Sequence, residues 1–502
     1  MLSRGRSLLP RTQQDQSLIA AGAGLAGGAL GLLTEGATLA LARVTGGRLR
    51  ATGLLAGAAL GGLLWARRKS GPAKAAVETA GQLLVFSAAG GELAVAAAER
   101  IPAEQRRRLL AKVGTTVVAA AAAVGAARQK LAEPRDLVKA SILYDYLPTV
   151  SGGLGSRLPL DRLDREGRKF LGNALPADRI SEVMGEEAVQ DPVRVFAGLD
   201  SAENPADRAR LAVAELERLG GFDRSRIVFF CPTGAGFVNP VAVETEELLS
   251  RGDVASVVVQ YSNKRAVRAF KDLKTARTTW RSVLEELGRA LAARAPGERP
   301  EIVVYGESLG CWVVAEAISE RGPETIEALH IARGALIGVP YTARKELRAI
   351  RESGAELPKG LGIFGSLDEL MALPQEEQQR LRYVLYTHPE DPVGIFNGTR
   401  LIWERPEWLT TEGRHPRLPR MHWLPWITYL HLLFDLKNGT GHSTAFANYA
   451  HDYRTELPTL LRVAFGHHDV TNRQLQAIEE ATVQAAERQA RREARARVGP
   501  RA

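Results

Sequence analysis

From residue 226 onward, short apolar segments rich in β-branched residues alternate with longer segments of helical periodicity. The apolar segments are five to seven residues long and contain few polar positions, which is typical of strands buried on both faces. They lie at residues 226–230, 255–261, 302–306, 334–339 and 382–387. Helical spacing follows at residues 265–294 and 309–321. This alternation predicts right-handed βαβ units and therefore a parallel sheet flanked by helices.

The first 135 residues follow another pattern, with long apolar stretches rich in Ala, Gly and Leu that are bounded by basic residues. Four such stretches lie at residues 18–42, 52–66, 74–98 and 109–127. Gly24 and Gly28, like Gly53 and Gly57, have the four-residue spacing that lets helices approach closely in lipid. A membrane span takes about 20 apolar residues, and these stretches are short or carry a charge. We expect residues 1–135 to form a membrane-spanning four-helix domain.

Two other interpretations of this region stay open. The first stretch ends in small residues at Ala42, as a signal peptide does before its cleavage site. The whole region also has the composition of a soluble, alanine-rich helical bundle. Basic residues occur in every loop, so the positive-inside rule does not orient the predicted spans.

The segments around the predicted sheet divide the rest of the chain. Residues 136–191 are rich in Gly, Pro and charge, and we interpret them as a linker. Asn204 and Pro205 predict the start of a helix that ends near Gly220. We assign residues 192–466 to a catalytic domain and residues 467–502 to a charged C-terminal helix or tail.

Charge and cysteine content exclude several classes of protein. The net charge of +9 belongs to the N-terminal part, because residues 1–139 hold 19 Lys and Arg against 8 Asp and Glu, whereas the remainder holds 47 against 49. These basic residues flank apolar stretches instead of alternating with aromatic residues, so the partner that we expect is a lipid bilayer and no nucleic acid. Two cysteines, Cys231 and Cys311, exclude a disulfide framework and a cysteine-built metal site. We expect neither a metal nor a cofactor.

The segment VVYGESLGCW, residues 303–312, joins a predicted strand to a predicted helix. Ser308 lies on the turn between them, and Gly306 and Gly310 lie two residues to either side. On such a turn the serine takes strained backbone angles that raise its hydroxyl above the sheet, and only glycines fit beside it. The backbone N–H of Leu309 would begin the helix and help to hold an oxyanion. The pattern therefore predicts a nucleophilic serine.

Partners for Ser308 follow in the order acid, then histidine, that this kind of site requires. Asp391 lies in the segment that follows the last predicted strand, and His442 lies in a later glycine-containing loop. The alternatives for the acid are Glu390 and Asp435, since Asp391 before a proline also suits a turn. The main alternative for the histidine is His451, with His388 and His431 less suited by their positions on a strand end and an apolar helix.

The second oxyanion donor should come from the loop after an early strand. The segment RIVFFCPTGAGFVNP offers a strand followed by a glycine-rich turn, which points to the backbone N–H of Ala235 or Gly236. A phosphate-binding loop is the competing interpretation, but the segment lacks the lysine and hydroxyl residue that end a P-loop.

Several segments between residues 192 and 466 together resemble one family. They include PTGAGFVNP, YGESLG, HPEDPVG, RPEWL and MHWLPWITYLHLLFDL, followed by a GHS loop. The sequence is similar to the bacterial α/β-hydrolases of the Abhydrolase 9 type, which carry an N-terminal membrane-spanning domain. The resemblance implies an α/β-hydrolase fold with Ser308, Asp391 and His442 as its triad. This chain departs from the family in GVPYTA, where a Gly-Pro-Pro is expected, and in GTGHSTAF, where Gly-His-Gly-His is usual.

These features predict a membrane-anchored serine hydrolase, of the esterase or lipase kind, which forms an acyl-enzyme on Ser308. Its substrate would be an acyl or ester compound, either a small molecule or a lipid. An acyltransferase that uses the same residues, and a catalytically silent membrane scaffold or receptor, remain as alternatives. We expect a multi-pass protein of the cell membrane with its catalytic domain on the cytoplasmic side. The sequence leaves a homo-oligomer open.

Overall fold

A computed structural model describes most of the chain from residue 144 onward. The described residues are 144–264, 272–311, 314, 326, 328–341, 343, 358–398, 400–410, 415–418, 421–424, 427–439, 446 and 450–498. By its contacts the chain divides into one unit of Met1–Ala132 with Phe396–Gly439 and another of Glu133–Ile395 with Thr440–Ala502. The four apolar stretches of the predicted membrane domain lie outside the described residues. No helix in the described part of the chain has both the length and the apolar character of a membrane span.

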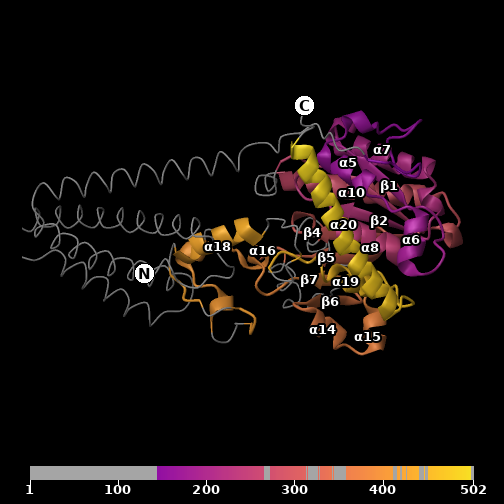
Figure 1. Cartoon of the computed structure of the whole chain (residues 1–502). Helices are drawn as coiled ribbons and strands as arrows, with labels where there is room; N and C mark the ends of the chain where they lie inside the picture. The colour runs from indigo at the N-terminus through magenta and orange to yellow at the C-terminus, as the bar shows by residue number, and fades with distance from the viewer. Residues whose placement is uncertain are drawn as a thin grey trace, which may run out of the picture. The chain divides into compact units, whose positions relative to one another are not determined.

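The second unit is built on a seven-stranded parallel sheet with the strand order β1-β3-β2-β4-β5-β7-β6 (Figure 1). Its strands are β1 (Val193–Ala197), β2 (Arg226–Cys231), β3 (Val254–Val259), β4 (Glu301–Glu307), β5 (Ile331–Ile337), β6 (Leu361–Phe364) and β7 (Tyr383–Tyr386). The five strands expected from the sequence are β2, β3, β4, β5 and β7, and the parallel sheet is confirmed. Strands β1 and β6 extend it at its two edges.

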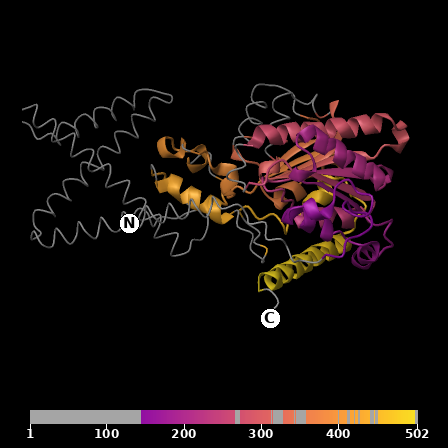
Figure 2. The ribbon, with the colours of Figure 1, turned by 90° about the horizontal axis from the view of Figure 1, so that it is seen from above.

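Helices cover both faces of this sheet. One face carries α7 (Pro205–Arg218) and α10 (Leu273–Ala292), and the other carries α5 (Arg165–Gly172), α6 (Ala177–Met184), α8 (Pro240–Leu249), α19 (Leu457–Ala464) and α20 (Asn472–Val498). Figure 2 shows α10 and α20 on opposite sides of the strands. Along β2, Ile227 and Phe229 enter one hydrophobic core while Val228 and Phe230 enter the other. The alternation follows from the two-residue period of a strand, and it explains why the central strands are continuously apolar.

The segment interpreted as a linker contains folded helices. Phe170 and Leu171 of α5 and Ile180 and Met184 of α6 are buried in the same core as the sheet. Helix α5 begins at Asp164, whose side chain accepts a hydrogen bond from the Gly167 N–H at 2.9 Å. The compact unit around the sheet therefore includes residues on the N-terminal side of position 192.

The helix predicted after Asn204 is present as α7. Asn204 caps it by accepting a hydrogen bond from the Asp207 N–H at 2.9 Å, Pro205 is its first residue, and Gly220 follows its end with a φ of 72°. The charged C-terminal segment forms α20, which packs on α6 and α8 through buried residues that include Leu475 and Ile478.

Shorter elements complete the described part of the chain. In the unit that contains the sheet they are η2 (Leu160–Arg162), η3 (Leu199–Ser201), η4 (Gly221–Asp223), η6 (Pro296–Glu298), α14 (Leu367–Met371), α15 (Gln375–Arg380) and α16 (Pro392–Ile395). The other unit contains α17 (Arg400–Trp403), η7 (Glu407–Leu409) and α18 (Ile427–Gly439).

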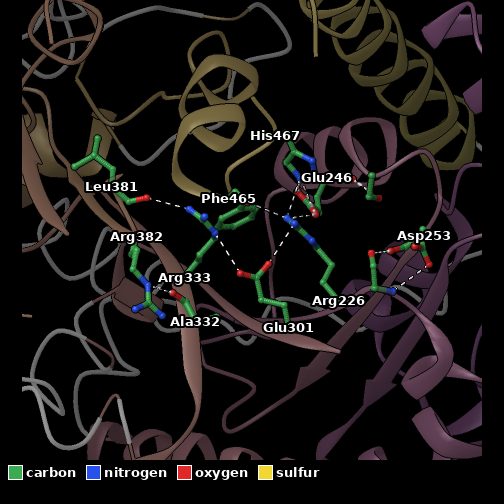
Figure 3. Close-up of polar contacts among 12 residues, drawn as sticks. Arg226, Glu246, Asp253, Glu301, Ala332, Arg333, Leu381, Arg382, Phe465 and His467 are labelled. Atoms are coloured by element: carbon green, nitrogen blue, oxygen red, sulfur yellow. Dashed lines mark hydrogen bonds and ion pairs between the residues drawn. The ribbon is translucent and has the colours of Figure 1, made fainter. Parts of the chain in front are cut away.

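The two ends of the sheet differ in composition. At the amino ends of the strands, charged residues such as Arg226, Glu301 and Arg333 form a network of ion pairs (Figure 3). At the carboxyl ends, β4 leads into Ser308 and β7 leads toward Asp391. Because parallel strands end at the same edge, both predicted catalytic residues arise at the carboxyl edge.

Candidate active site

Ser308 lies on a sharp turn between β4 and the helical residues 309–311. Its φ of 55° is in the left-handed region, which non-glycine residues rarely adopt. The Ser308 N–H donates to the carbonyl oxygen of Ile337, at the end of the neighbouring strand β5, at 2.9 Å. The backbone is therefore strained and anchored where the sequence predicts a nucleophile elbow.

The glycines beside Ser308 are required by close backbone contacts. A Cβ atom on Gly306 would lie 2.8 Å from both the Cα and the N of Cys311, and one on Gly310 would collide with the carbonyl oxygen of Cys231. Neither contact can be relieved by rotating a side chain, since the opposing atoms belong to the backbone. Residues 306 and 310 thus have to be glycine for β4 and the following helix to approach each other and β2.

The loop after β2 leaves the sheet beside the elbow, because Cys231 is paired with Gly306 in the parallel register. A tight turn forms there, in which the Thr233 N–H donates to Phe237 O and the Gly236 N–H donates to Thr233 O, both at 2.9 Å. The Gly236 N–H is therefore already used within the loop. Ala235 is held through its carbonyl oxygen, which accepts a hydrogen bond from Gln260 Nε2 at 3.3 Å.

Asp391 is fully buried, and both of its carboxylate oxygens accept hydrogen bonds. Oδ1 accepts from the Val393 N–H at 2.8 Å, which fixes the side chain to the start of α16. Oδ2 accepts from Nδ1 of His451 at 2.8 Å and from the hydroxyl of Tyr453 at 2.5 Å. An aspartate in this position fixes the orientation of an imidazole and stabilises its protonated form.

His451 is the histidine that the structure brings to Asp391. The sequence favoured His442 and held His451 as the alternative; His442 lies outside the described residues. Nδ1 of His451 faces Asp391, and no described residue is hydrogen-bonded to Nε2. A Cβ atom on Gly338 would lie 2.8 Å from Cε1 of His451, and Gly338 directly follows Ile337, the residue that anchors Ser308. The imidazole therefore lies at the carboxyl edge next to the elbow.

The electrostatic surroundings of His451 suit a base. Burial lowers the pKa of His451, but the charge of Asp391 and the hydrogen bond to it outweigh that effect, so the pKa is raised above the usual value for histidine. Glu307 and Asp452 raise it further through their charges. A buried imidazole surrounded by carboxylates is stabilised once it has accepted a proton.

Glu307 is a site residue that the sequence analysis did not single out. It lies between Gly306 and Ser308, is buried, and accepts hydrogen bonds through Oε2 from Asn239 Nδ2 at 3.0 Å and from the Tyr305 hydroxyl at 2.7 Å. Burial raises the pKa of Glu307, although Tyr305, His451 and Asn239 oppose the shift. One feature of the sequence could have indicated Glu307. In YGESLG a charged residue directly precedes the nucleophile, whereas the strand before it is apolar after its first residue.

The remaining candidates take other positions. His388 is buried beside the site and has partners on both ring nitrogens, Ala450 O and Glu456 Oε2. Asp435 and His431 lie on α18, in the other unit of the chain. Cys231 and Cys311 are both buried free cysteines, and burial raises the pKa of each thiol. Across the part of the chain that the structure describes, no group of His, Cys, Asp and Glu side chains is arranged to hold a metal ion.

The comparison with protein families agrees with this architecture. Residues 193–478, more than half of the chain, match the model of an alpha/beta-hydrolase family, Abhydrolase_9. No curated protein and no solved structure gives a significant match. The matched range begins at β1 and reaches α20, so it contains the whole sheet, the elbow at Ser308 and the Asp391–His451 pair. The chain belongs to this alpha/beta-hydrolase family.

Proposed function

We propose that this protein is a serine hydrolase that cleaves carboxylic esters, with Ser308 as nucleophile, His451 as general base and Asp391 as the acid. The observation that carries the proposal is the hydrogen bond of 2.8 Å between Asp391 Oδ2 and His451 Nδ1, at the same sheet edge as the strained turn of Ser308. This bond fixes the tautomer of a neutral imidazole that can accept a proton at Nε2.

In this mechanism His451 takes the proton of the Ser308 hydroxyl as the serine oxygen attacks the ester carbonyl. The negative charge on the carbonyl oxygen is held by the N–H groups of Leu309 and Ala235. We favour Ala235 over Gly236 because the Gly236 N–H is occupied by Thr233 O. The protonated His451 then gives its proton to the leaving alcohol, and an acyl-enzyme on Ser308 remains. Water then attacks the acyl carbon while His451 takes one of its protons; the bond from the acyl carbon to the Ser308 oxygen breaks, His451 returns the proton to that oxygen, and the carboxylic acid leaves.

The nucleophile is tested with a fluorophosphonate probe, which reacts with activated serines. We expect full-length protein in membranes to be labelled on Ser308, as located by mass spectrometry, and to hydrolyse p-nitrophenyl esters. Ser308→Ala should lose both, whereas Ser225→Ala should retain both, because Ser225 lies at the opposite edge and donates to Asp253 O. An unlabelled wild-type protein that is folded would favour the scaffold interpretation instead.

The choice of histidine is tested separately. His451→Ala should slow labelling of Ser308 by roughly three orders of magnitude, because the serine then lacks its base. His442→Ala should label at nearly the wild-type rate. The reverse result would assign the base to His442 and leave His451 a supporting role.

Anchoring in the cell membrane is the second part of the proposal, and it rests on the apolar stretches of residues 1–135. We propose several spans, with the catalytic domain in the cytoplasm and an acyl or ester substrate that reaches it from solution or from the bilayer. The full chain should then remain in the membrane pellet after alkaline extraction, and protease added to intact cells should spare the catalytic domain. Release of the protein from the pellet at high pH would refute the proposed membrane anchoring and would leave the proposed catalytic mechanism unaffected.

A further inference from the structure

The segment from Ala450 to Glu456 delivers His451 and Tyr453 to Asp391, and its backbone begins in an unfavourable conformation. Ala450 has a φ of 60°, a left-handed value that is unfavourable for a residue with a Cβ atom. Such a conformation persists only when neighbouring contacts determine it. Ala450 is also the residue directly before the proposed base, so whatever holds its peptide group also places His451.

His388 holds both ends of this segment. Its Nδ1 lies 2.9 Å from the carbonyl oxygen of Ala450, and its Nε2 lies 2.6 Å from Oε2 of Glu456. His388 is fully buried and Glu456 is nearly so. The two contacts therefore fix the residue before His451 and the residue before helix α19 to a single imidazole ring.

The hydrogen-bonding groups define the protons in these contacts. A carbonyl oxygen can only accept, so Nδ1 of His388 donates to Ala450 O. The short contact between Nε2 and Glu456 then requires one more proton, held either by the imidazole or by the carboxyl group. In both forms the contact is a direct hydrogen bond, and a glutamine at position 456 could replace it by donating its amide N–H to Nε2.

Further contacts connect His388 to the catalytic acid. The His388 ring stacks on Tyr453 with 4.4 Å between the ring centroids, and its backbone N–H donates to the Tyr453 hydroxyl at 3.3 Å. That hydroxyl donates to Asp391, whose own N–H donates to His388 O at 3.0 Å. The two segments that supply the acid and the imidazole, 388–391 and 450–456, are thus joined through His388 from several directions.

We propose that His388 and Glu456 form a positioning pair, which sets the distance and orientation of His451 relative to Asp391 and Ser308. The inference rests on the proposed function, because it concerns the same base. Neither residue of the pair contacts substrate in this scheme. Their effect on the reaction passes through the peptide of Ala450 and through Tyr453, and it should appear in the rate of chemistry instead of in substrate binding.

The test compares Glu456→Ala with Glu456→Gln in the full-length protein. These variants are preferred to His388→Ala, which would also remove the ring that stacks on Tyr453. The readout is the rate constant of fluorophosphonate labelling at Ser308, since unfolding lowers the labelled amount whereas misplacement of His451 lowers the rate constant. Esterase assays add kcat and KM separately.

We expect Glu456→Ala to lower the labelling rate constant and kcat by roughly 10- to 100-fold with KM little changed, as for a misplacement of about 1 Å. Glu456→Gln should stay within about threefold of wild type, since its amide can donate to Nε2 of His388. The matched control is His467→Ala, which removes another buried histidine paired with a glutamate, at the amino edge of the sheet. We expect His467→Ala to leave the rate constant of labelling unchanged, even if less of the protein is folded and labelled.

Two results would overturn the inference. A wild-type rate constant for Glu456→Ala would show that the pair does not position the base. An equal slowing in His467→Ala would show that loss of any buried pair has this effect. A wild-type protein whose Ser308 does not react at all would refute the proposed function itself, and this inference with it.

Discussion

Helix α19 joins two buried histidine–carboxylate pairs at opposite edges of one sheet, and the two pairs have different surroundings. Before the helix, His451 lies 2.8 Å from Asp391 at the carboxyl edge. After it, His467 lies 3.0 Å from Glu246 at the amino edge. The residue pairs are chemically alike, so their roles have to follow from what surrounds them.

At the amino edge an arginine completes the pair. Arg226 lies 3.3 Å from Glu246 and 2.9 Å from Nε2 of His467, and it also pairs with Glu301, which pairs with Arg333 (Figure 3). Burial raises the pKa of Glu246, but the charges of His467 and Arg226 outweigh it, so that the pKa is lowered. Each carboxylate of this network has a permanent cation as partner. Such a network ties β2 to α8 and α19 without needing to move a proton.

At the carboxyl edge the partners of Asp391 are the imidazole, a tyrosine hydroxyl and a backbone N–H. Arginine is not among them, and the raised pKa belongs here to the histidine. Nδ1 of His451 is occupied while no described residue is bonded to Nε2. A histidine–carboxylate pair thus becomes a candidate base when no permanent cation neutralises the acid and one ring nitrogen stays available.

Neutralising the acid of each pair should have the largest effect on activity at one edge and little effect at the other. Asp391→Asn should lower kcat by roughly 10³- to 10⁴-fold, because an amide neither fixes the reactive tautomer nor stabilises the imidazolium. Glu246→Gln should leave kcat within about twofold and lower the free energy of unfolding by about 1–3 kcal/mol, since Arg226 and His467 lose a charged partner. Steady-state kinetics and urea unfolding measure the two effects. Similar losses of kcat in both variants would refute the division of roles.

A smaller effect should come from Gly338, against which His451 and Tyr453 pack. Its φ of 65° disfavours a side chain, and a Cβ atom would lie 2.8 Å from Cε1 of His451. Gly338→Ala should lower kcat by roughly 100-fold because the imidazole has to shift. Gly185→Ala is the matched control, since Gly185 has a φ of 67° but no atom within 4 Å of the added Cβ. Equal kinetics in the two variants would mean that His451 need not stay where it is.

The sheet could be predicted from the sequence where its strands are apolar, and two strands were missed for physical reasons. Strand β1 contains Arg194, a charged residue in a buried position that is balanced by two hydrogen bonds to Glu247, at 2.5 and 2.8 Å. Strand β6 has four residues and lies at the sheet edge, where Ile363 is exposed. Neither gives the buried apolar run by which the other strands were found. The helices of the expected linker were not predicted because each has only eight residues; α5 contains Gly167 and Gly172, and α6 lies between Pro176 and Gly185.

Ser308 could be predicted from the sequence because the residues that its turn requires lie next to it in the chain. The glycines two residues away on each side are demanded by backbone contacts within the same turn and with the neighbouring strand. The choice of histidine depends on contacts between segments 60 residues apart, such as Asp391 with His451, and spacing along the chain does not determine these. The same holds for His388 and Glu456, which are 68 positions apart.

The smallest predicted effect concerns two glutamates on the same strand. β4 begins with Glu301 at the amino edge and ends with Glu307 beside the elbow, so the effect of each charge on the pH profile can be compared. The negative charge of Glu307 raises the pKa of His451, and the base has to be neutral to accept a proton. In Glu307→Gln the pKa of His451 should therefore fall, and the acid limb of kcat/KM should move to lower pH. Glu301→Gln removes an equal charge that is paired with Arg226 and Arg333, so its pH profile should match that of the wild type. A shift to higher pH in Glu307→Gln, or equal profiles in both variants, would mean that the charge of Glu307 does not reach the base.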